Sequence, residues 1–329
     1  MVELSANDNL LEHDVVMPFM IERSHIRGRF VRLKKSLTEV IKQHQYPHVV
    51  SRLLGEMLAM AALVGATLKL EGVVSIQLHG NRPIRLIVAD YTSEGHVRGY
   101  AKWNEEDADY LKQTQEYDFK ALMASGNLMI SIDHRQWNDK YQGIVPIEKE
   151  TLAGCMEDYF RQSDQLDACI RLDSSFKANN GSSYWIASGM MIQRLPQQGG
   201  KPVELVYDKH DKALSDDNDE RALYVEPNEW EHASILFQTL THDEMTDGHL
   251  SPEGLVYRLY HDDGVRIFNP QPVIAKCRCS RERICSVLCS MPNEEIEPLY
   301  IDDVINVKCE FCSKNELFTR TEVMDIKHH

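Results

Sequence analysis

Residues 277–290 read CRCSRERICSVLCS, and residues 307–312 read VKCEFC. These two stretches hold six of the eight cysteines of the 329-residue chain, whereas the residues before them contain only Cys155 and Cys169. In a reducing compartment, clustered cysteines more often bind metal or carry out redox chemistry than form structural disulfides. We therefore expect the C-terminal end of the chain to fold around its thiols.

Two close cysteine pairs define the predicted site. Cys277 and Cys279 form a C-x-C pair, and Cys309 and Cys312 form a C-x-x-C pair after residues 280–308. Two close pairs separated by a loop have the spacing of a tetrahedral zinc site, in which the metal closes the loop. The sequence therefore predicts one Zn²⁺ ion bound by four cysteines.

The run VKCEFC is typical of a zinc knuckle, in which a short strand precedes a turn whose backbone amides donate to sulfur. Leu317 and Phe318 are expected on the return strand. Ser313 follows the knuckle, where Gly or Asn would ease a left-handed turn. Several nearby cations would offset the charge of four thiolates and keep the thiols deprotonated: Lys276, Arg278, Arg281, Arg283 and Lys308.

Two further cysteines lie between the pairs. Ser280 is a predicted N-cap for a helix through RERICSVLC, and Cys285 and Cys289 are four residues apart on one flank of that helix. They are either half-buried helix thiols or alternative ligands and oxidation partners. The spacing leaves both readings open.

The C-x-C pair favours a redox-active site. A disulfide between near neighbours closes a very small ring and is easily reduced, and zinc-bound thiolates are poised for peroxide or hypochlorite. Structural zinc contributes about 10–16 kcal/mol in small modules, whereas a whole domain is stable by only about 5–15 kcal/mol. Oxidation that ejects the metal would thus unfold the module and destabilise whatever packs on it. A purely structural zinc clip is the alternative.

Hydrophobic periodicity predicts an α+β fold for the rest of the chain. Helices and strands alternate without a regular βαβ rhythm, which argues against a doubly wound sheet. Helical spacing covers residues 34–70, with a break at Pro47, and residues 150–166. Alternating strands are expected at residues 73–80, 84–91, 96–103, 127–133 and 184–195.

The composition changes at Pro196. Residues 208–220 are strongly acidic and are expected to lack packed structure, and two helices follow from Asn228 and from Ser251-Pro252. The sequence thus predicts three parts. These are a large N-terminal α+β body at residues 1–192, a helical and partly loose linker at 193–270, and a small C-terminal zinc module at 271–329.

Net charge and hydropathy disfavour several classes of partner and location for this protein. A net charge of −15 disfavours nucleic acid and anionic membranes as partners. The apolar run from Met57 to Leu68 is shorter than the ~20 residues that a membrane span needs, so we expect a core helix. The first residues lack the pattern of a secretory signal, so we expect a cytoplasmic protein. Motifs for nucleotide binding or hydrolysis are absent from the sequence, which favours a binding function over an enzyme.

At this point the sequence resembles the heat-shock protein 33 family of redox-regulated chaperones, also called the 33 kDa chaperonin. The resemblance covers nearly the whole chain. It is carried by IERSHIRGRFVRL (21–33), YQGIVPIEKETLAGCMEDYFRQSDQL (141–166), ASGMMIQRLP (187–196), FNPQPVIAKCRCSRERI (268–284) and CEFC (309–312). The CxCSRER element with a distal C-x-x-C pair is highly specific.

The resemblance implies how the cysteines work. Cys277, Cys279, Cys309 and Cys312 would bind zinc in the reduced, inactive form. On oxidation Cys277 would pair with Cys279, and Cys309 with Cys312, so that zinc leaves, the module unfolds and the linker loosens. The active form would be a homodimer that holds unfolding client proteins without ATP.

A chaperone of this kind needs apolar surface that is hidden in the reduced form. Candidate client-binding residues are Met190, Met191, Trp230, Leu236, Phe237 and Leu240; ordinary core packing is the alternative for each of them.

Two other classes of protein remain as alternative functions. A zinc-ribbon nucleic-acid-binding protein would use the basic residues 21–35, and a thiol–disulfide oxidoreductase would need the C-x-x-C pair at a helix N-terminus.

Overall fold

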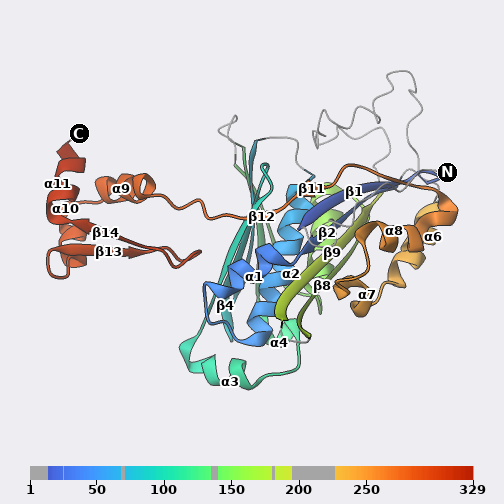
Figure 1. Ribbon diagram of the computed structural model, residues 1–329, viewed down its shortest axis with the longest axis horizontal. Coiled ribbons are helices and arrows are strands. Elements are labelled where there is room, and N and C mark those ends of the chain that lie inside the picture. Colours follow the sequence, from blue (N-terminus) through green and yellow to red (C-terminus); the bar gives the residue numbers. More distant parts are fainter. Residues whose placement is uncertain are drawn as a thin grey trace. The chain divides into compact units, whose positions relative to one another are not determined.

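The computed structural model of the chain describes residues 14–24, 26–67, 71–134, 140–179, 182–194 and 227–328. The fold is α+β, as predicted, and the chain divides into two compact units, Met1–Ala275 and Lys276–His329. Figure 1 shows the elements of each unit in sequence order. The acidic residues 208–220 lie outside the described part of the chain.

The first sheet of the larger unit is antiparallel and runs in the order β10-β1-β2-β9-β8, with β11 also paired to β1. Its strands are β1 (Val15–Ile21), β2 (Ile26–Leu33), β8 (Ala168–Asn179), β9 (Ser182–Gln193), β10 (Val265–Ile267) and β11 (Gln271–Pro272).

The second sheet runs in the order β12-β5-β4-β3-β6-β7, and only its β12–β5 pair is parallel. Its strands are β3 (Gly72–Gly80), β4 (Ile84–Thr92), β5 (His96–Trp103), β6 (Gly126–His134), β7 (Lys140–Pro146) and β12 (Ile274–Ala275). The strands predicted at 73–80, 84–91, 96–103 and 127–133 are confirmed as β3 to β6.

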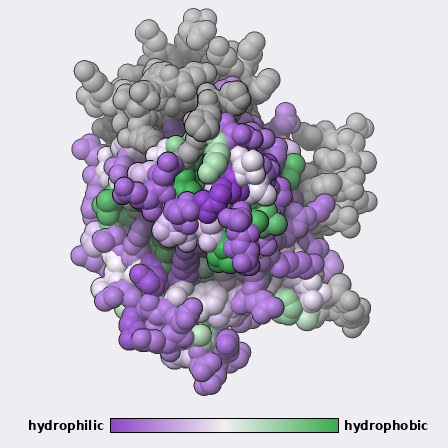
Figure 2. Space-filling model, turned by 90° about the vertical axis from the view of Figure 1, so that its left-hand side faces the viewer, coloured by the Kyte–Doolittle hydropathy of each residue, from purple (hydrophilic) through white to green (hydrophobic). Residues whose placement is uncertain are grey.

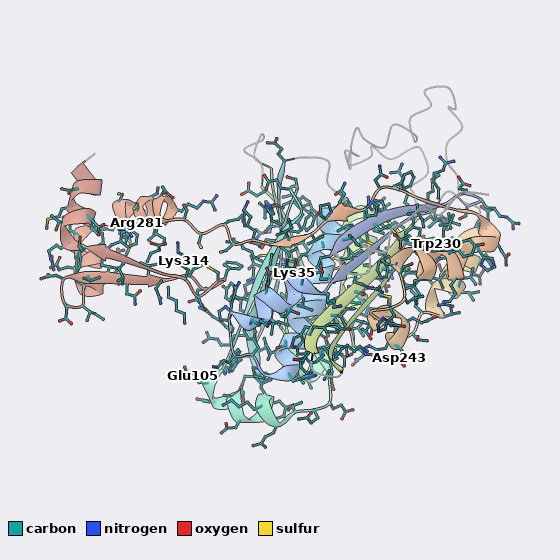
Figure 3. All side chains as sticks on the ribbon, in the orientation of Figure 1. Lys35, Glu105, Trp230, Asp243, Arg281 and Lys314 are labelled. Carbon is teal, nitrogen blue, oxygen red and sulfur yellow. The ribbon has the colours of Figure 1, made fainter. Side chains whose placement is uncertain are left out.

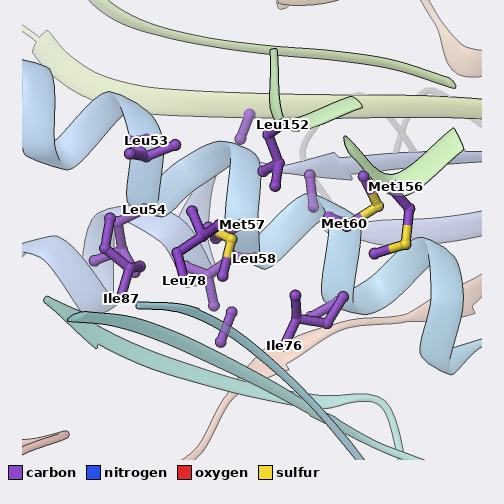
Figure 4. Packing of buried hydrophobic residues seen from close by; sticks show 14 of the residues in the cluster. Leu53, Leu54, Met57, Leu58, Met60, Ile76, Leu78, Ile87, Leu152 and Met156 are labelled. Atoms are coloured by element: carbon purple, nitrogen blue, oxygen red, sulfur yellow. The ribbon is translucent and has the colours of Figure 1, made fainter. Parts of the chain in front are cut away.

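The core is built around one helix. The helical pattern predicted at residues 34–70 divides at Pro47 into α1 (Lys35–Lys42) and α2 (His48–Gly65). The apolar side chains of α2 contact both sheets (Figure 4). By length and composition α2 could cross a membrane, but 89% of it is buried inside the protein. The predicted core helix is therefore confirmed.

Shorter helices complete the larger unit around the second sheet and around β8. They are α3 (Ala108–Gln113), α4 (Phe119–Met123) and α5 (Leu152–Tyr159), with helical turns at Glu105–Asp107, Phe160–Asp164 and His261–Asp263. The helix predicted at 150–166 is α5 followed by the turn at Phe160–Asp164. Thr151 caps α5, because its hydroxyl accepts a hydrogen bond from the N–H of Gly154.

Three linker helices cover the outer face of the first sheet. They are α6 (Pro227–Gln238), α7 (His242–Thr246) and α8 (Pro252–Tyr260). Because successive side chains of a strand point to opposite faces, β2 sends Val31 toward α2 and Phe30 toward the linker helices. A second hydrophobic core therefore lies between the first sheet and α6–α8.

Two polar contacts fasten the linker helices to the sheet. Arg32 on β2 is only 2% exposed, and its guanidinium donates to the carbonyl oxygens of Met245 and Leu250. His242 at the start of α7 lies 2.8 Å from Asp173 on β8, measured from Nδ1 to Oδ1. Burial lowers the pKa of Arg32 to about 10, so burying this cation is costly, and the hydrogen bonds to the linker carbonyls offset part of that cost.

A buried carboxyl group on α2 makes the stability of the larger unit depend on pH. Burial raises the pKa of Glu56 to about 7, although it accepts a 2.6 Å hydrogen bond from Tyr117. The folded state keeps a proton that the unfolded state loses between about pH 4.5 and 7, so the free energy of unfolding falls as pH rises through this range.

Replacing this carboxyl by an amide should remove the pH dependence. We expect Glu56→Gln to raise the thermal midpoint at pH 8, by an amount corresponding to a free energy on the order of 3 kcal/mol at most, with little change at pH 5. Thermal unfolding of both proteins between pH 5 and 8 measures this. The exposed Glu39→Gln is the matched control, and parallel pH profiles for wild type and Glu56→Gln would contradict the prediction.

The smaller unit, which we call the C-terminal module, has few elements. They are α9 (Arg281–Ser290), α10 (Asn293–Ile296), a turn at Glu297–Leu299, β13 (Val304–Lys308), β14 (Asn315–Thr319) and α11 (Arg320–His328). Strands β13 and β14 form an antiparallel hairpin. The buried hydrophobic core of the C-terminal module consists of Leu288, Ile296, Ile305, Phe318 and Val323. A core this small rarely stabilises a fold by itself, and natural modules of this size add metals or disulfides.

Candidate metal centre

The four predicted ligand cysteines come together in the C-terminal module. The Sγ atoms of Cys277, Cys279, Cys309 and Cys312 all lie within 4.8 Å of one another. The Cys277–Cys309 and Cys279–Cys312 sulfur pairs are 3.7 Å and 3.4 Å apart. Four sulfurs at about 2.3 Å from a tetrahedral Zn²⁺ would be about 3.8 Å apart. The cluster can therefore bind a metal ion, and its size fits zinc.

The local sequence places these thiols as the knuckle pattern predicted. Strand β13 ends one residue before Cys309, and the chain then turns into β14, which carries Leu317 and Phe318. The N–H of Cys309 donates to the carbonyl of Lys314 at 2.9 Å, and this bond closes the turn. On the other side of the cluster, the N–H of Cys279 donates to the Sγ of Cys277 at 3.4 Å.

Ser313 sits in the turn with φ of 54°, the left-handed conformation expected from its position. This conformation costs about 1–2 kcal/mol for a residue with a Cβ. We expect Ser313→Gly to stabilise the module by about 1 kcal/mol and to tighten metal binding by about fivefold. Competition with a chromophoric chelator measures the affinity. Ser313→Ala keeps the Cβ and is the control; an equal gain for alanine would contradict this explanation.

The cations around the thiols differ in part from those predicted. Arg281 was expected to offset the charge of the thiolates, but its guanidinium donates to the Leu317 carbonyl and forms ion pairs with Glu316 and Glu322. Lys314 is a further cation near the thiols that the sequence pattern did not indicate. Its pKa is raised by its hydrogen bond to Glu316 and further by the charges of Cys279 and Cys312. Figure 3 labels Arg281 and Lys314 within the module.

Without metal, the Cys277 and Cys279 thiols compete for negative charge. Burial disfavours the Cys277 thiolate, but hydrogen bonds from the Cys279 N–H and the neighbouring thiols outweigh burial, and the pKa of Cys277 falls to about 7. Burial and the adjacent Cys277 raise the pKa of Cys279. A metal cation removes this competition, because coordinated thiols are deprotonated outright.

Cys285 and Cys289 lie on α9 outside the four-thiol cluster, and both are half-buried. Cys285 packs against the hydrophobic core of the module. The helix itself is capped as predicted, because Ser280 Oγ accepts a hydrogen bond from the N–H of Arg283.

The structure places the candidate client-binding residues in the interior or at its margin. Met190 belongs to the core beneath the linker helices, whereas Met191 faces α2. On α6 and just after it, Phe237 and Leu240 are buried in the same core as Met190. Trp230 and Leu236 are partly buried at its edge. These residues therefore share one covered surface, with Met191 on the opposite side of the sheet.

The basic run at residues 21–35 contains both buried and exposed cations. It includes β2, in which Arg29 is 8% exposed and Arg32 is 2% exposed, whereas the Arg23 side chain is 71% exposed. Nucleic-acid phosphates cannot reach the two buried arginines, so burial in β2 removes them from the predicted nucleic-acid-binding face.

Fold and site together define a class: an α+β protein with a small C-terminal module held around four clustered thiols. A family model described as Hsp33 protein matches residues 14–319. The 33 kDa chaperonin of Caulobacter vibrioides is 36% identical over 316 residues, covering 95% of this chain and 97% of the relative. The chain belongs to the Hsp33 family, and thus to a family of chaperonins and not of enzymes.

Two further comparisons agree. The 33 kDa chaperonin of Shewanella loihica is 32% identical over 314 residues, with 95% of each chain covered. The crystal structure of the 33 kDa chaperonin of Thermotoga maritima, a heat shock protein 33 homologue, matches with a TM-score of 0.72 at 20% identity. That match covers 96% of this chain and 98% of the other. The second likeness concerns the fold alone.

Proposed function

We propose that this chain is a redox-regulated, ATP-independent holdase. In the reduced form Cys277, Cys279, Cys309 and Cys312 hold one Zn²⁺, and client-binding surface is covered. Oxidation converts the ligands to disulfides and releases the zinc, so that the C-terminal module unfolds and the linker at residues 193–270 loosens. The exposed apolar surface then binds unfolding proteins and prevents their aggregation.

The arrangement of the four thiols carries this proposal. They come from the start of the module and from the turn between β13 and β14, and the described core of the module has five buried side chains. Structural zinc is worth about 10–16 kcal/mol in such modules, which is comparable to the whole stability of a typical domain. A reaction that consumes these thiolates therefore acts on the fold of the entire module.

The redox step follows from thiol chemistry. One thiolate of each pair attacks hydrogen peroxide, which breaks the O–O bond and leaves a sulfenic acid and water. The second thiol attacks that sulfur, so that an S–S bond forms and another water leaves. Cys277–Cys279 and Cys309–Cys312 are the proposed pairs, as the resemblance to the Hsp33 family implies. The thiolates thereby lose the electron pairs that bind the metal.

The covered surface is the outer face of the first sheet together with the helix surface that packs on it. Met190, Phe237 and Leu240 lie in that core and Trp230 and Leu236 at its margin, which makes this surface the proposed client site. Hydrophilic residues dominate the face drawn in Figure 2, and the described hydrophobic residues there form small, separate patches.

The remaining expectations belong to the same proposal. The active form is a homodimer, and the protein works in the reducing cytoplasm, where zinc keeps the thiols reduced until oxidative stress. The three-part division into body, linker and module describes which parts stay folded and which open.

Zinc analysis before and after mild oxidation, followed by an aggregation assay with a thermally unfolding client, tests the proposal. We expect one equivalent of zinc in the reduced protein, and loss of zinc together with a gain of client protection. Zinc lost without client protection, or retained under oxidation, would make the cluster a structural clip. Peptide mapping of the oxidised protein checks the two disulfide pairs.

A further inference from the structure

Two cysteines of the C-terminal module take no part in the proposed switch. Cys285 and Cys289 lie one turn apart on α9 and are both half-buried. They are the only other cysteines in the module. Once the four ligand thiols are oxidised, these two are the remaining thiols of the module that an oxidant can attack.

The helix keeps this pair from reacting with itself. Side chains at i and i+4 on a helix have Cβ atoms about 5–6 Å apart, whereas a disulfide requires about 3.5–4.5 Å. A Cys285–Cys289 bond therefore cannot close while α9 is formed. Conversely, once the bond is made, this part of the chain cannot return to helix.

Helix α9 depends on the rest of the module. It has ten residues, fewer than the about 12–15 at which an isolated helix becomes even marginally stable. Its N-cap, Ser280, directly follows the ligand Cys279, and Arg281 fastens its first turn to the Leu317 carbonyl of β14 at 2.9 Å. Loss of the metal site therefore removes the support of the helix at its N-terminal end.

We propose that a third disulfide, Cys285–Cys289, forms after the module has opened and locks it open. The inference rests on the proposed function, because opening must come first. One thiol reduces hydrogen peroxide to water and becomes a sulfenic acid, and the other thiol displaces a second water to form the S–S bond. Restoring the four ligand thiols alone then leaves α9 unable to refold, and recovery waits for reduction of the third bond.

Peptide mapping of the whole chain tests this directly. The zinc-loaded protein is treated with hydrogen peroxide while warmed, then denatured, alkylated without reduction and digested with trypsin. Cleavage after Arg283 and Lys308 gives a peptide of residues 284–308, in which Cys285 and Cys289 are the only cysteines. We expect this peptide unalkylated and about 2 Da lighter than the dithiol form.

The outcomes separate this inference from the proposed function. Zinc release with peptide 284–308 doubly alkylated would overturn the third disulfide and leave the switch intact. Zinc release with this peptide cross-linked to a ligand peptide would overturn the third disulfide and one of the proposed ligand pairs. Zinc retained under peroxide would overturn the proposed function, and the locking bond with it. Zinc release together with the light peptide supports both.

A pair of variants tests the locking effect. Cys285→Ala/Cys289→Ala should release zinc on oxidation as wild type does, but rebind it several-fold faster when dithiothreitol and zinc are added back. Ser286→Ala/Ser290→Ala has the same spacing on the same helix and a similar gain in helix propensity, so it should recover at the wild-type rate. Equal recovery rates for all three proteins would overturn the locking role. If the cysteine variant does not fold, the wild-type peptide map still decides whether the third bond forms.

Discussion

Cys309→Ser, or removal of the metal by a chelator under reducing conditions, should unfold residues 276–329 and leave the two sheets of the larger unit folded. The reason is energetic: the module has a five-residue core, whereas its metal would contribute about 10–16 kcal/mol. Hydrogen exchange followed by mass spectrometry measures this directly. The amides of β13 and β14 should lose protection, whereas those of β2 and β9 should keep it.

The control for this experiment is Cys289→Ser, which changes a thiol of the same module outside the cluster. It should keep both the metal and the exchange protection. Protected β13 and β14 amides in a metal-free protein would show that the hydrophobic core suffices, and the proposed switch would lose its driving force.

Phe237→Asp should release the linker helices from the sheet without any oxidant. Phe237 is 4% exposed in the core between α6 and the first sheet, and burying an unpaired carboxylate costs several kcal/mol. We expect faster hydrogen exchange in α6–α8 and client protection in the reduced, zinc-bound protein. The aggregation assay and zinc content are measured on the same sample.

Ile235→Asp is the matched control, because Ile235 lies on the same helix but is 56% exposed. It should change neither exchange nor activity. Released helices without client protection would show that clients need the helix surface that Phe237→Asp damages, and not the sheet face beneath it. Unchanged exchange in Phe237→Asp would show that this core does not hold the linker.

The four-cysteine cluster, α9 and the hairpin of the C-terminal module could be predicted from the sequence because their signals are local, whereas α10 and α11 were not predicted. Ligand spacing, the cap at Ser280, the return strand and the strained position of Ser313 each depend on a few neighbouring residues. Lys314 was missed because its role depends on Glu316, which holds it beside the thiols. The partners of Arg281 could not be foreseen for a similar reason, since they lie on β14 and α11.

In the larger unit, some strands and helices could be predicted from the sequence and others could not. Strands β3 to β6 alternate clearly, but IRGRFVRL was read as a basic run because three arginines interrupt it. In the fold that run is β2, a strand buried on both faces, and Arg32 is buried because linker carbonyls more than two hundred residues away accept from it. Helical spacing predicted α6 and α8 but not the five-residue α7 (His242–Thr246), and spacing cannot identify the surface against which a helix packs.

The segment between the linker helices and the C-terminal module has a further consequence. Its short strands β10 and β11 pair with β1, and β12 pairs with β5, so this one segment lies at an open edge of both sheets. Uncovered strand edges recruit other chains into aggregates. The chain thus covers the edges of β1 and β5 with ladders of only two or three residue pairs, which can separate one pair at a time.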